Sequence, residues 1–308
     1  MADSQRRPVG LVGLGNMGLP MASRLMTAGW EVLGVDTSGQ ARESARKIGV
    51  TLADSVADLA KTAGVIILML PTSDVVDAVS EYILAAKGRT CEIVIDMSSS
   101  EPGRTRLLAE RFADAGIALV DAPVSGGVIG ATSGALTIMA GGSHDDVRRV
   151  FPLLEALGSR VVHVGGVGTG HALKALNNLL SATHLLASNE AAIVAARFGI
   201  DPETLLSVVN DSSGRSGSTE LKLPHYVLTG AFDSGFSARL LEKDVRVAAN
   251  LATEVGVEPG IAAAVLAHWS ELNSELPPDA DHTEIIRPLE RRYGLEIRSR
   301  DRTETTGR

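Results

Sequence analysis

Cysteine and aromatic side chains are scarce in this chain. Its 308 residues include one cysteine, Cys91, which excludes an internal disulfide and a cluster of metal-binding thiolates. Seven histidines are present, but no two have the HxxxH spacing of a helical metal site, so we expect no metal. Aromatic residues make up 3% of the chain, which predicts an aliphatic core.

Long apolar runs and an excess of positive charge are also lacking. The apolar run at 65–70 is far too short to span a bilayer, and no apolar targeting segment precedes the first expected strand. The net charge of −8 argues against nucleic acid or an anionic membrane surface as the main partner. We therefore expect a cytoplasmic protein, which also fits the low cysteine content.

What the chain does have is a glycine-rich turn near its N-terminus. An apolar run from Val9 breaks at Gly13-x-Gly15-x-x-Gly18, and a helical pattern follows. A strand, a tight turn and a helix N-terminus in this order can hold a pyrophosphate, because glycines permit the turn and a close approach of the backbone. The weaker alternative is a tight turn in an ordinary α/β domain. The motif residues expected at the cofactor are Gly13, Gly15, Asn16, Met17 and Gly18.

An acidic residue downstream supports the nucleotide interpretation. The pattern at 31–36 predicts a second strand that ends in Asp36, about 20 residues past the glycines, where a ribose 2′-hydroxyl is bound. A carboxylate there repels a 2′-phosphate, and the next residues, Thr37 and Ser38, are not basic. The sequence therefore predicts NAD as cofactor, with NADP disfavoured.

Strand and helix patterns alternate up to residue 164. This alternation predicts an α/β fold, a Rossmann-type doubly wound and mainly parallel sheet over 1–164. Strands are expected near 8–13, 31–35, 65–70, 93–96, 117–120, 135–140 and 160–164. Ligands of such sheets bind at the carboxyl ends of the strands. The residues expected to line the cofactor groove there are Leu70, Pro71, Thr72, Ser98 and Ser99.

The second half of the sequence is helical throughout. One long pattern without proline or internal glycine runs from 171 to about 197. Further helices are expected near 202–211, 218–229, 237–256 and 258–275. This predicts an all-α C-terminal domain over 165–297, joined to the first domain by the long helix. The charged, apolar-poor residues 298–308 predict a flexible tail.

Two segments outside the glycine-rich turn look chemical. Ser125, Gly126 and Gly127 follow the fifth strand and can offer a hydroxyl and backbone N–H groups to a carboxylate; a glycine-rich bend without a ligand explains this segment equally well. Lys174 and Asn178 lie four residues apart and share one face of the long helix. A lysine that borders a cavity can exchange protons near neutral pH, whereas one that snorkels to water is only structural.

These segments together resemble the β-hydroxyacid dehydrogenases, which include 3-hydroxyisobutyrate dehydrogenase, tartronate semialdehyde reductase and L-threonate dehydrogenase. The resemblance covers residues 8–295 and includes a fourth segment around Phe236 and Lys243. It implies reversible, metal-free hydride transfer between NAD and a small 3-hydroxy acid, in a homodimer or homotetramer joined by the helical domains. It further implies that Lys174 is the general acid/base, that Asn178 and Asn177 contact substrate, that Ser125, Gly126 and Gly127 bind its carboxylate, and that Phe236 and Lys243 lie beside the cofactor.

Several alternatives remain open at this point. The same groups would serve a tartronate or succinic semialdehyde reductase, or a glyoxylate reductase, working in the reductive direction. A 6-phosphogluconate dehydrogenase has a much larger helical domain, and imine reductases usually lack the lysine. A non-catalytic NAD-binding scaffold is the alternative of a different class. His171, Asp281 and His282 are candidates for substrate contact, although a histidine at a helix start is more often structural.

Overall fold

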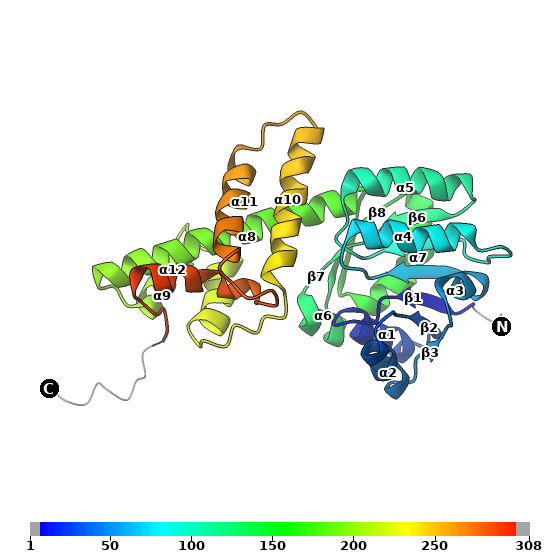
Figure 1. Cartoon of the computed structure of the whole chain (residues 1–308), viewed down its shortest axis with the longest axis horizontal. Helices are drawn as coiled ribbons and strands as arrows, with labels where there is room; N and C mark the ends of the chain where they lie inside the picture. Colours follow the sequence, from blue (N-terminus) through cyan, green and yellow to red (C-terminus); the bar gives the residue numbers. More distant parts are fainter. Residues whose placement is uncertain (1–6, 300–308) are drawn as a thin grey trace. The chain divides into compact units, whose positions relative to one another are not determined.

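The computed structural model describes residues 7–299, which form two compact units divided between Lys174 and Ala175 (Figure 1). In the described part of the first unit, nine strands form one sheet in the order β3-β2-β1-β4-β5-β6-β8-β7, with β9 paired to β8. The strands are β1 (Val9–Val12), β2 (Val32–Val35), β3 (Thr51–Leu52), β4 (Val65–Leu68), β5 (Ile93–Asp96), β6 (Ala118–Asp121), β7 (Val124–Ser125), β8 (Thr137–Gly141) and β9 (Arg160–Gly165).

The predicted parallel character of the sheet is confirmed for strands β1 to β6. Each pairs in parallel with its neighbour, whereas β8 runs antiparallel to both β6 and β7. Strands β3 and β7 are two residues long and were not predicted, because so short a stretch leaves no alternating or apolar run to recognise.

Helices cover both faces of this sheet. Helices α1, α2, α6 and α7 pack on one face around Leu11 and Val120, and α3, α4 and α5 pack on the other around Val12 and Leu119. Both clusters are largely aliphatic, as the low aromatic content predicts. The helices are α1 (Gly18–Thr27), α2 (Gly39–Lys47), α3 (Val56–Thr62), α4 (Ser73–Ala85), α5 (Pro102–Asp114), α6 (Gly127–Ser133) and α7 (His144–Leu157). The second of the two clusters encloses Cys91, and burial raises the pKa of its thiol to about 12.

Hydroxyl side chains fix where four of these helices begin. Ser38, Ser55, Thr72 and Ser143 each accept a hydrogen bond from the backbone N–H three residues later. Such a cap satisfies one of the N–H groups that the first turn of a helix leaves unpaired, typically for about 1 kcal/mol.

The second unit is built from helices around one apolar cluster. Its elements are α8 (Thr169–Phe198), which begins in the first unit, α9 (Pro202–Asn210), the π-helix η1 (Ser218–Val227), α10 (Ala238–Glu254), α11 (Gly260–Asn273), the 3-10 helix η2 (His282–Ile286) and α12 (Arg287–Tyr293). Trp269 is fully buried in this cluster, and its indole Nε1 donates to the carbonyl of Ala238 at 3.1 Å. The predicted all-helical character is confirmed for the described residues of this unit.

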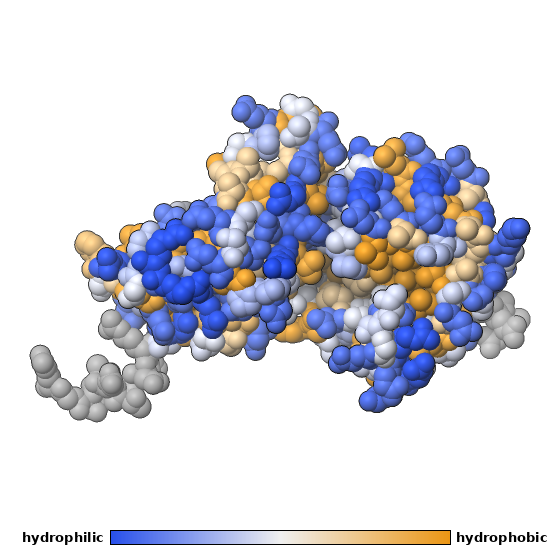
Figure 2. Space-filling view, viewed as in Figure 1, coloured by the Kyte–Doolittle hydropathy of each residue, from blue (hydrophilic) through white to orange (hydrophobic). Residues whose placement is uncertain are grey.

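Helix α8 is apolar for much of its 30 residues. By length and composition alone it could cross a membrane, yet 39% of its most apolar window is already buried within the structure, and core helices of globular proteins pass the same test. On the face in Figure 2, polar residues cover much of the helical unit and apolar residues lie in separate patches. The apolar composition of α8 is therefore explained in part by packing.

A buried carboxylate holds the loop before α10 against the start of η2. Asp281 accepts hydrogen bonds from the backbone N–H groups of Gly235 and Phe236 at 2.9 and 3.3 Å, and it caps η2 through the N–H of Thr283 at 2.9 Å. The adjacent His282 lies inside this arrangement and is 5% exposed. Burial, followed by the nearby Lys222 charge, lowers the pKa of His282 to about 4.

The structure describes only residues 298 and 299 of the expected tail. Arg298 Nη1 donates to Glu290 Oε1 at 2.7 Å, and the N–H of Ser299 donates to the Leu228 carbonyl at 3.0 Å. These two residues of the expected tail are therefore hydrogen bonded to the helical unit. Residues 300–308 of that prediction lie outside the described residues.

The buried state of His282 predicts a pH-dependent stability. Its pKa is about 6.5 in the unfolded chain and about 4 when folded, so the stability present above pH 6.5 is lost as pH falls toward 4, by roughly 3 kcal/mol. Urea unfolding at pH 7.5 and 4.5 measures this loss. In His282→Phe, the loss of unfolding free energy between the two pH values is expected to be smaller than in wild type by that amount. His144→Phe replaces an exposed histidine and is expected to keep the wild-type loss. An equal pH dependence in wild type and His282→Phe would contradict the prediction.

Candidate active site

The glycine-rich turn after β1 has the geometry of a phosphate cradle. Gly13 has φ +97°, and a Cβ there would lie 2.1 Å from the carbonyl oxygen of Met69. A Cβ on Gly18 would lie 1.8 Å from the carbonyl oxygen of Gly13. Gly15 differs, because nothing lies within 4 Å of its Cβ position and its backbone faces open space. Two of the glycines are thus required by close packing, and the third leaves room for a ligand.

Asp36 closes the other side of this cradle. Its Oδ2 accepts the N–H of Leu14 at 2.7 Å, and its Oδ1 accepts the N–H of Ser38 at 2.7 Å. A hollow of about 730 Å³ lies beside it, with Gly15 and Asn16 in its wall. An open glycine and a fixed carboxylate in one hollow fit the adenosine half of a dinucleotide.

The strand-end residues expected at the cofactor are joined to one another. The hydroxyl of Ser98, after β5, accepts the N–H of Leu70, after β4, at 2.9 Å. The hydroxyl of Thr72 caps α4. Of the hydroxyls assigned to the groove by sequence, that of Ser98 therefore joins the ends of two neighbouring strands and that of Thr72 fixes the start of a helix. Pro71 and Ser99 lie between these positions and the following helices.

The Ser125 segment forms an exposed turn at the edge of the sheet. Ser125 ends β7 and pairs with Thr137 of β8. Gly126 and Gly127 follow with φ +128° and +59°, conformations that favour glycine, and both are exposed. An exposed position is what binding of a carboxylate by this segment requires.

Asp121 holds the start of α8 at the end of β6. Its Oδ1 accepts the N–H of Gly168 at 2.7 Å, and its Oδ2 accepts the N–H of His171 at 2.9 Å. A Cβ on Gly170 would lie 2.3 Å from the carbonyl oxygen of Met139, so the helix touches the neighbouring strands without any side chain between. Burial raises the pKa of Asp121, while His171 and these N–H groups favour its ionised form. Sequence reasoning missed this role, because its partners lie 47 and 50 residues away.

His171 is an interior residue that ties α8 to the first unit. Its ring Nε2 donates to the carbonyl of Ser98 at 3.1 Å, and Nδ1 lies 2.8 Å from the hydroxyl of Thr105 on α5. The residue is 1% exposed and has the carboxylates of Asp96 and Asp121 within 4 Å. The sequence allows His171 either to contact substrate or to have a structural role, and these buried contacts favour the structural role.

One helical turn after His171, α8 carries Lys174, and one turn later it carries Asn178. The amide Nδ2 of Asn178 donates to Asp244 Oδ2 on α10 at 2.5 Å, and its Oδ1 accepts from Asn177 Nδ2 at 3.2 Å. Lys174 is half-buried and Asn178 is 5% exposed. The orientation of Asn178 is therefore set by a buried carboxylate.

Asp244 also joins two of the predicted residues. Its Oδ1 lies 3.1 Å from Lys243 Nζ, so one carboxylate contacts both Asn178 and Lys243. Sequence reasoning assigned no role to Asp244. An acid at a buried position of an amphipathic helix was the available signal. The rings of Phe236 and His282 pack in a T-shaped arrangement, with 5.7 Å between the ring centroids.

Comparison with known proteins covers both units. A family described as the NAD binding domain of 6-phosphogluconate dehydrogenase matches residues 8–165, and one described as NAD-binding of NADP-dependent 3-hydroxyisobutyrate dehydrogenase matches residues 168–289. The mitochondrial 3-hydroxyisobutyrate dehydrogenase of Homo sapiens is 37% identical over 86% of this chain and 81% of its own length.

Two solved structures extend this similarity to the fold. The Mycobacterium tuberculosis 3-hydroxyisobutyrate dehydrogenase with L-serine has a TM-score of 0.84 and 29% identity, over 92% of this chain and 99% of that one. Psf3 in complex with NADP+ and 2-OPP has a TM-score of 0.80 and 26% identity, over 91% and 99%. With its glycine cradle, its docked long helix and these matches along almost its whole length, the chain belongs to the β-hydroxyacid dehydrogenase family of NAD(P)-binding oxidoreductases.

Proposed function

We propose that this chain reversibly transfers a hydride between a small 3-hydroxy acid and NAD, with Lys174 as the general acid/base. The observation that carries the proposal is the attachment of α8, which bears Lys174 and Asn178, to the end of β6 through Asp121. Ligands of doubly wound sheets bind at these strand ends. The human relative named 3-hydroxyisobutyrate dehydrogenase supports this class of substrate.

Each step of the reaction has a group to perform it. A bound nicotinamide accepts or donates the hydride. The Lys174 amine removes the proton of the substrate hydroxyl, or returns it in the reductive direction. Asn178 has a second amide N–H besides the one bound to Asp244, and it donates this N–H to the hydroxyl oxygen. The hydroxyl of Ser125 and the N–H groups of Gly126 and Gly127 bind the carboxylate.

Replacement of Lys174 tests the proton-transfer role. Lys174→Ala is expected to lower kcat by about 10²–10⁴, because the proton acceptor is lost, while NAD binding stays near wild type. Lys174→Arg keeps the charge but cannot lose a proton, so it is expected to be nearly as inactive. Steady-state kinetics on 3-hydroxyisobutyrate and NAD titration measure both. A raised KM with unchanged kcat in either variant would show that the lysine only binds substrate, and activity near wild type would remove it from the mechanism.

The choice of NAD over NADP is assigned to Asp36. Both of its carboxylate oxygens are held by backbone N–H groups, so the negative charge cannot swing away from a 2′-phosphate. Arg42 on α2 contacts the backbone carbonyl of Asp36, at 3.5 Å, rather than its carboxylate. The similar structure of Psf3 contains NADP+, so the cofactor preference of this chain needs a direct test.

Asp36→Ala is expected to reduce the preference for NAD at least about tenfold, because the repulsion of the 2′-phosphate and the ribose hydrogen bonds are both lost. The ratio of kcat/KM for NAD to that for NADP measures this preference. The control is Asp54→Ala, which removes another carboxylate of the first unit outside the hollow. An unchanged ratio in Asp36→Ala would refute the assignment.

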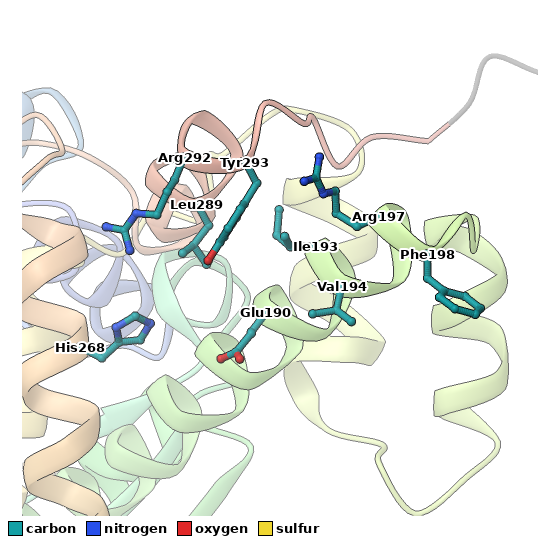
Figure 3. Close-up of a pocket in the computed structure, with 9 residues that line it drawn as sticks. All are labelled: Glu190, Ile193, Val194, Arg197, Phe198, His268, Leu289, Arg292 and Tyr293. Carbon is teal, nitrogen blue, oxygen red and sulfur yellow. The ribbon is translucent and has the colours of Figure 1, made fainter.

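We also infer a homodimer joined through the C-terminal half of α8. Apolar residues recur on one face of this helix at Leu180, Ala187, Ala191, Val194 and Phe198, with Val194 62% and Phe198 85% exposed. Beside this stripe lies a hollow of about 580 Å³, with residues of α8 on one side and of α12 on the other (Figure 3). An exposed apolar stripe with an adjacent hollow is typical of a contact between subunits.

Charge on this stripe is expected to dissociate the dimer. Val194→Asp with Phe198→Asp places two carboxylates in the contact, which raises the dissociation constant at least about 100-fold. Sedimentation velocity measures the change in mass. Val208→Asp on α9, which is equally exposed, is the control and is expected to leave the mass unchanged. A double variant with the wild-type mass, or a monomeric wild type, would refute the contact.

A further inference from the structure

The imidazole of His171 joins the first turn of α8 to two further elements of the first unit. Nε2 lies 3.1 Å from the carbonyl oxygen of Ser98, after β5, and Nδ1 lies 2.8 Å from the hydroxyl of Thr105 on α5. The backbone N–H of the same residue donates to Asp121, at the end of β6. A helix held at one point can still turn about that point, whereas contacts with three separate elements restrict both its position and its rotation. The turn of α8 that precedes Lys174 is therefore held from three sides.

The two hydrogen bonds of this ring are not equally well determined. A carbonyl oxygen only accepts, so the bond to Ser98 requires a proton on Nε2. Nδ1 then accepts from the hydroxyl of Thr105, whose proton has a competing acceptor in the carbonyl of Glu101 at 3.1 Å. Two carboxylates lie near the ring but too far for a hydrogen bond, with Asp96 Oδ2 3.7 Å from Nε2 and Asp121 Oδ2 3.9 Å from Nδ1. The bond from Nε2 to Ser98 is thus the one with a single possible direction.

Ser98 belongs to the edge of the sheet where the cofactor is expected. Its hydroxyl accepts the N–H of Leu70, after β4, at 2.9 Å, and its own N–H donates to Asp96, at the end of β5, at 3.0 Å. The residue is 3% exposed, so its carbonyl is a fixed point to which α8 is bonded. One helical turn past His171, about 4.5 Å along the axis, the same helix carries Lys174.

We propose that His171 is a positioning residue that acts on catalysis through its Nε2 bond to Ser98. This bond sets the distance between the strand end expected at the cofactor and the amine of Lys174. The inference rests on the proposed function, because it takes Lys174 to be the general acid/base and the nicotinamide to lie at the strand ends. Misplacement of a reacting group by about 1 Å can cost about 100-fold in rate, so loss of the bond is expected to lower kcat rather than to weaken binding.

Two substitutions of equal length isolate this hydrogen bond. In His171→Gln the amide nitrogen lies as many bonds from Cβ as Nε2 does, so it can donate to the Ser98 carbonyl. His171→Met has a side chain of the same length without a donor. With 3-hydroxyisobutyrate and NAD, we expect kcat of His171→Met to fall at least about tenfold, while KM and the NAD dissociation constant stay within about threefold of wild type. For His171→Gln, kcat is expected to stay within about threefold of wild type. Equal kcat values in the two variants, whether low or near wild type, would overturn the inference.

Thr105→Val is the control for the other bond of the ring. It removes the hydroxyl next to Nδ1 and keeps the shape of the side chain, so kcat is expected to stay within about threefold of wild type. Thermal unfolding checks that this variant and both His171 variants are folded. A fall in kcat equal to that of His171→Met would show that support of the ring in general is responsible, and it would overturn the assignment to Ser98.

Combination with Lys174→Ala separates this inference from the proposed function. Where Lys174→Ala lowers kcat as proposed, the addition of His171→Met is expected to lower it by less than about threefold further, because the group that the histidine positions is already absent. A further loss of about tenfold in the double variant would overturn the inference and leave the proposed function standing. Activity of Lys174→Ala near wild type would refute the proposed function, and this inference with it.

Discussion

The structure depends above all on one carboxylate, Asp121, which accepts the N–H groups of Gly168, just before α8, and of His171, in its first turn. This interaction connects the end of a sheet strand to the helix that bears Lys174, although the two are about 50 residues apart in the chain. A carboxylate at a helix N-terminus is favoured both by its hydrogen bonds and by the helix dipole. Because Gly170 brings the helix backbone against the sheet, a shift of even an ångström would break both contacts. The contacts between the start of α8 and the sheet therefore fix the position of Lys174.

Buried acids organise the second unit in a similar way. Asp244 orients the amide of Asn178, and Asp281 gathers the N–H groups of the loop before α10. Each removes a negative charge from water, which is costly unless the charge is fully hydrogen bonded. In each case the partners are a backbone segment or a side-chain amide, and the carboxylate fixes their position.

The fold could be predicted from sequence wherever the signal is local. The glycine turn and the strand that precedes Asp36 each depend on a few neighbouring residues, and both lie where the sequence predicts them. Strand β7 was not predicted because it is two residues long, and helix α6 was not predicted because it is short and contains two glycines. Hydrogen-bond partners that lie far apart in the sequence were not predicted, for a different reason. Nothing near His171 indicates that its ring will bond Ser98 and Thr105, because that pairing exists only once β5, α5 and α8 are packed together.

The buried thiol of Cys91 has a practical consequence. Thiol reagents react with the thiolate, and a group enclosed by aliphatic side chains and kept protonated well above neutral pH offers almost none. Cysteines introduced on the surface of either unit can therefore be labelled selectively in the otherwise unaltered chain. Pairs of fluorescent or spin labels attached in this way would report the separation of the two units directly, with and without dinucleotide.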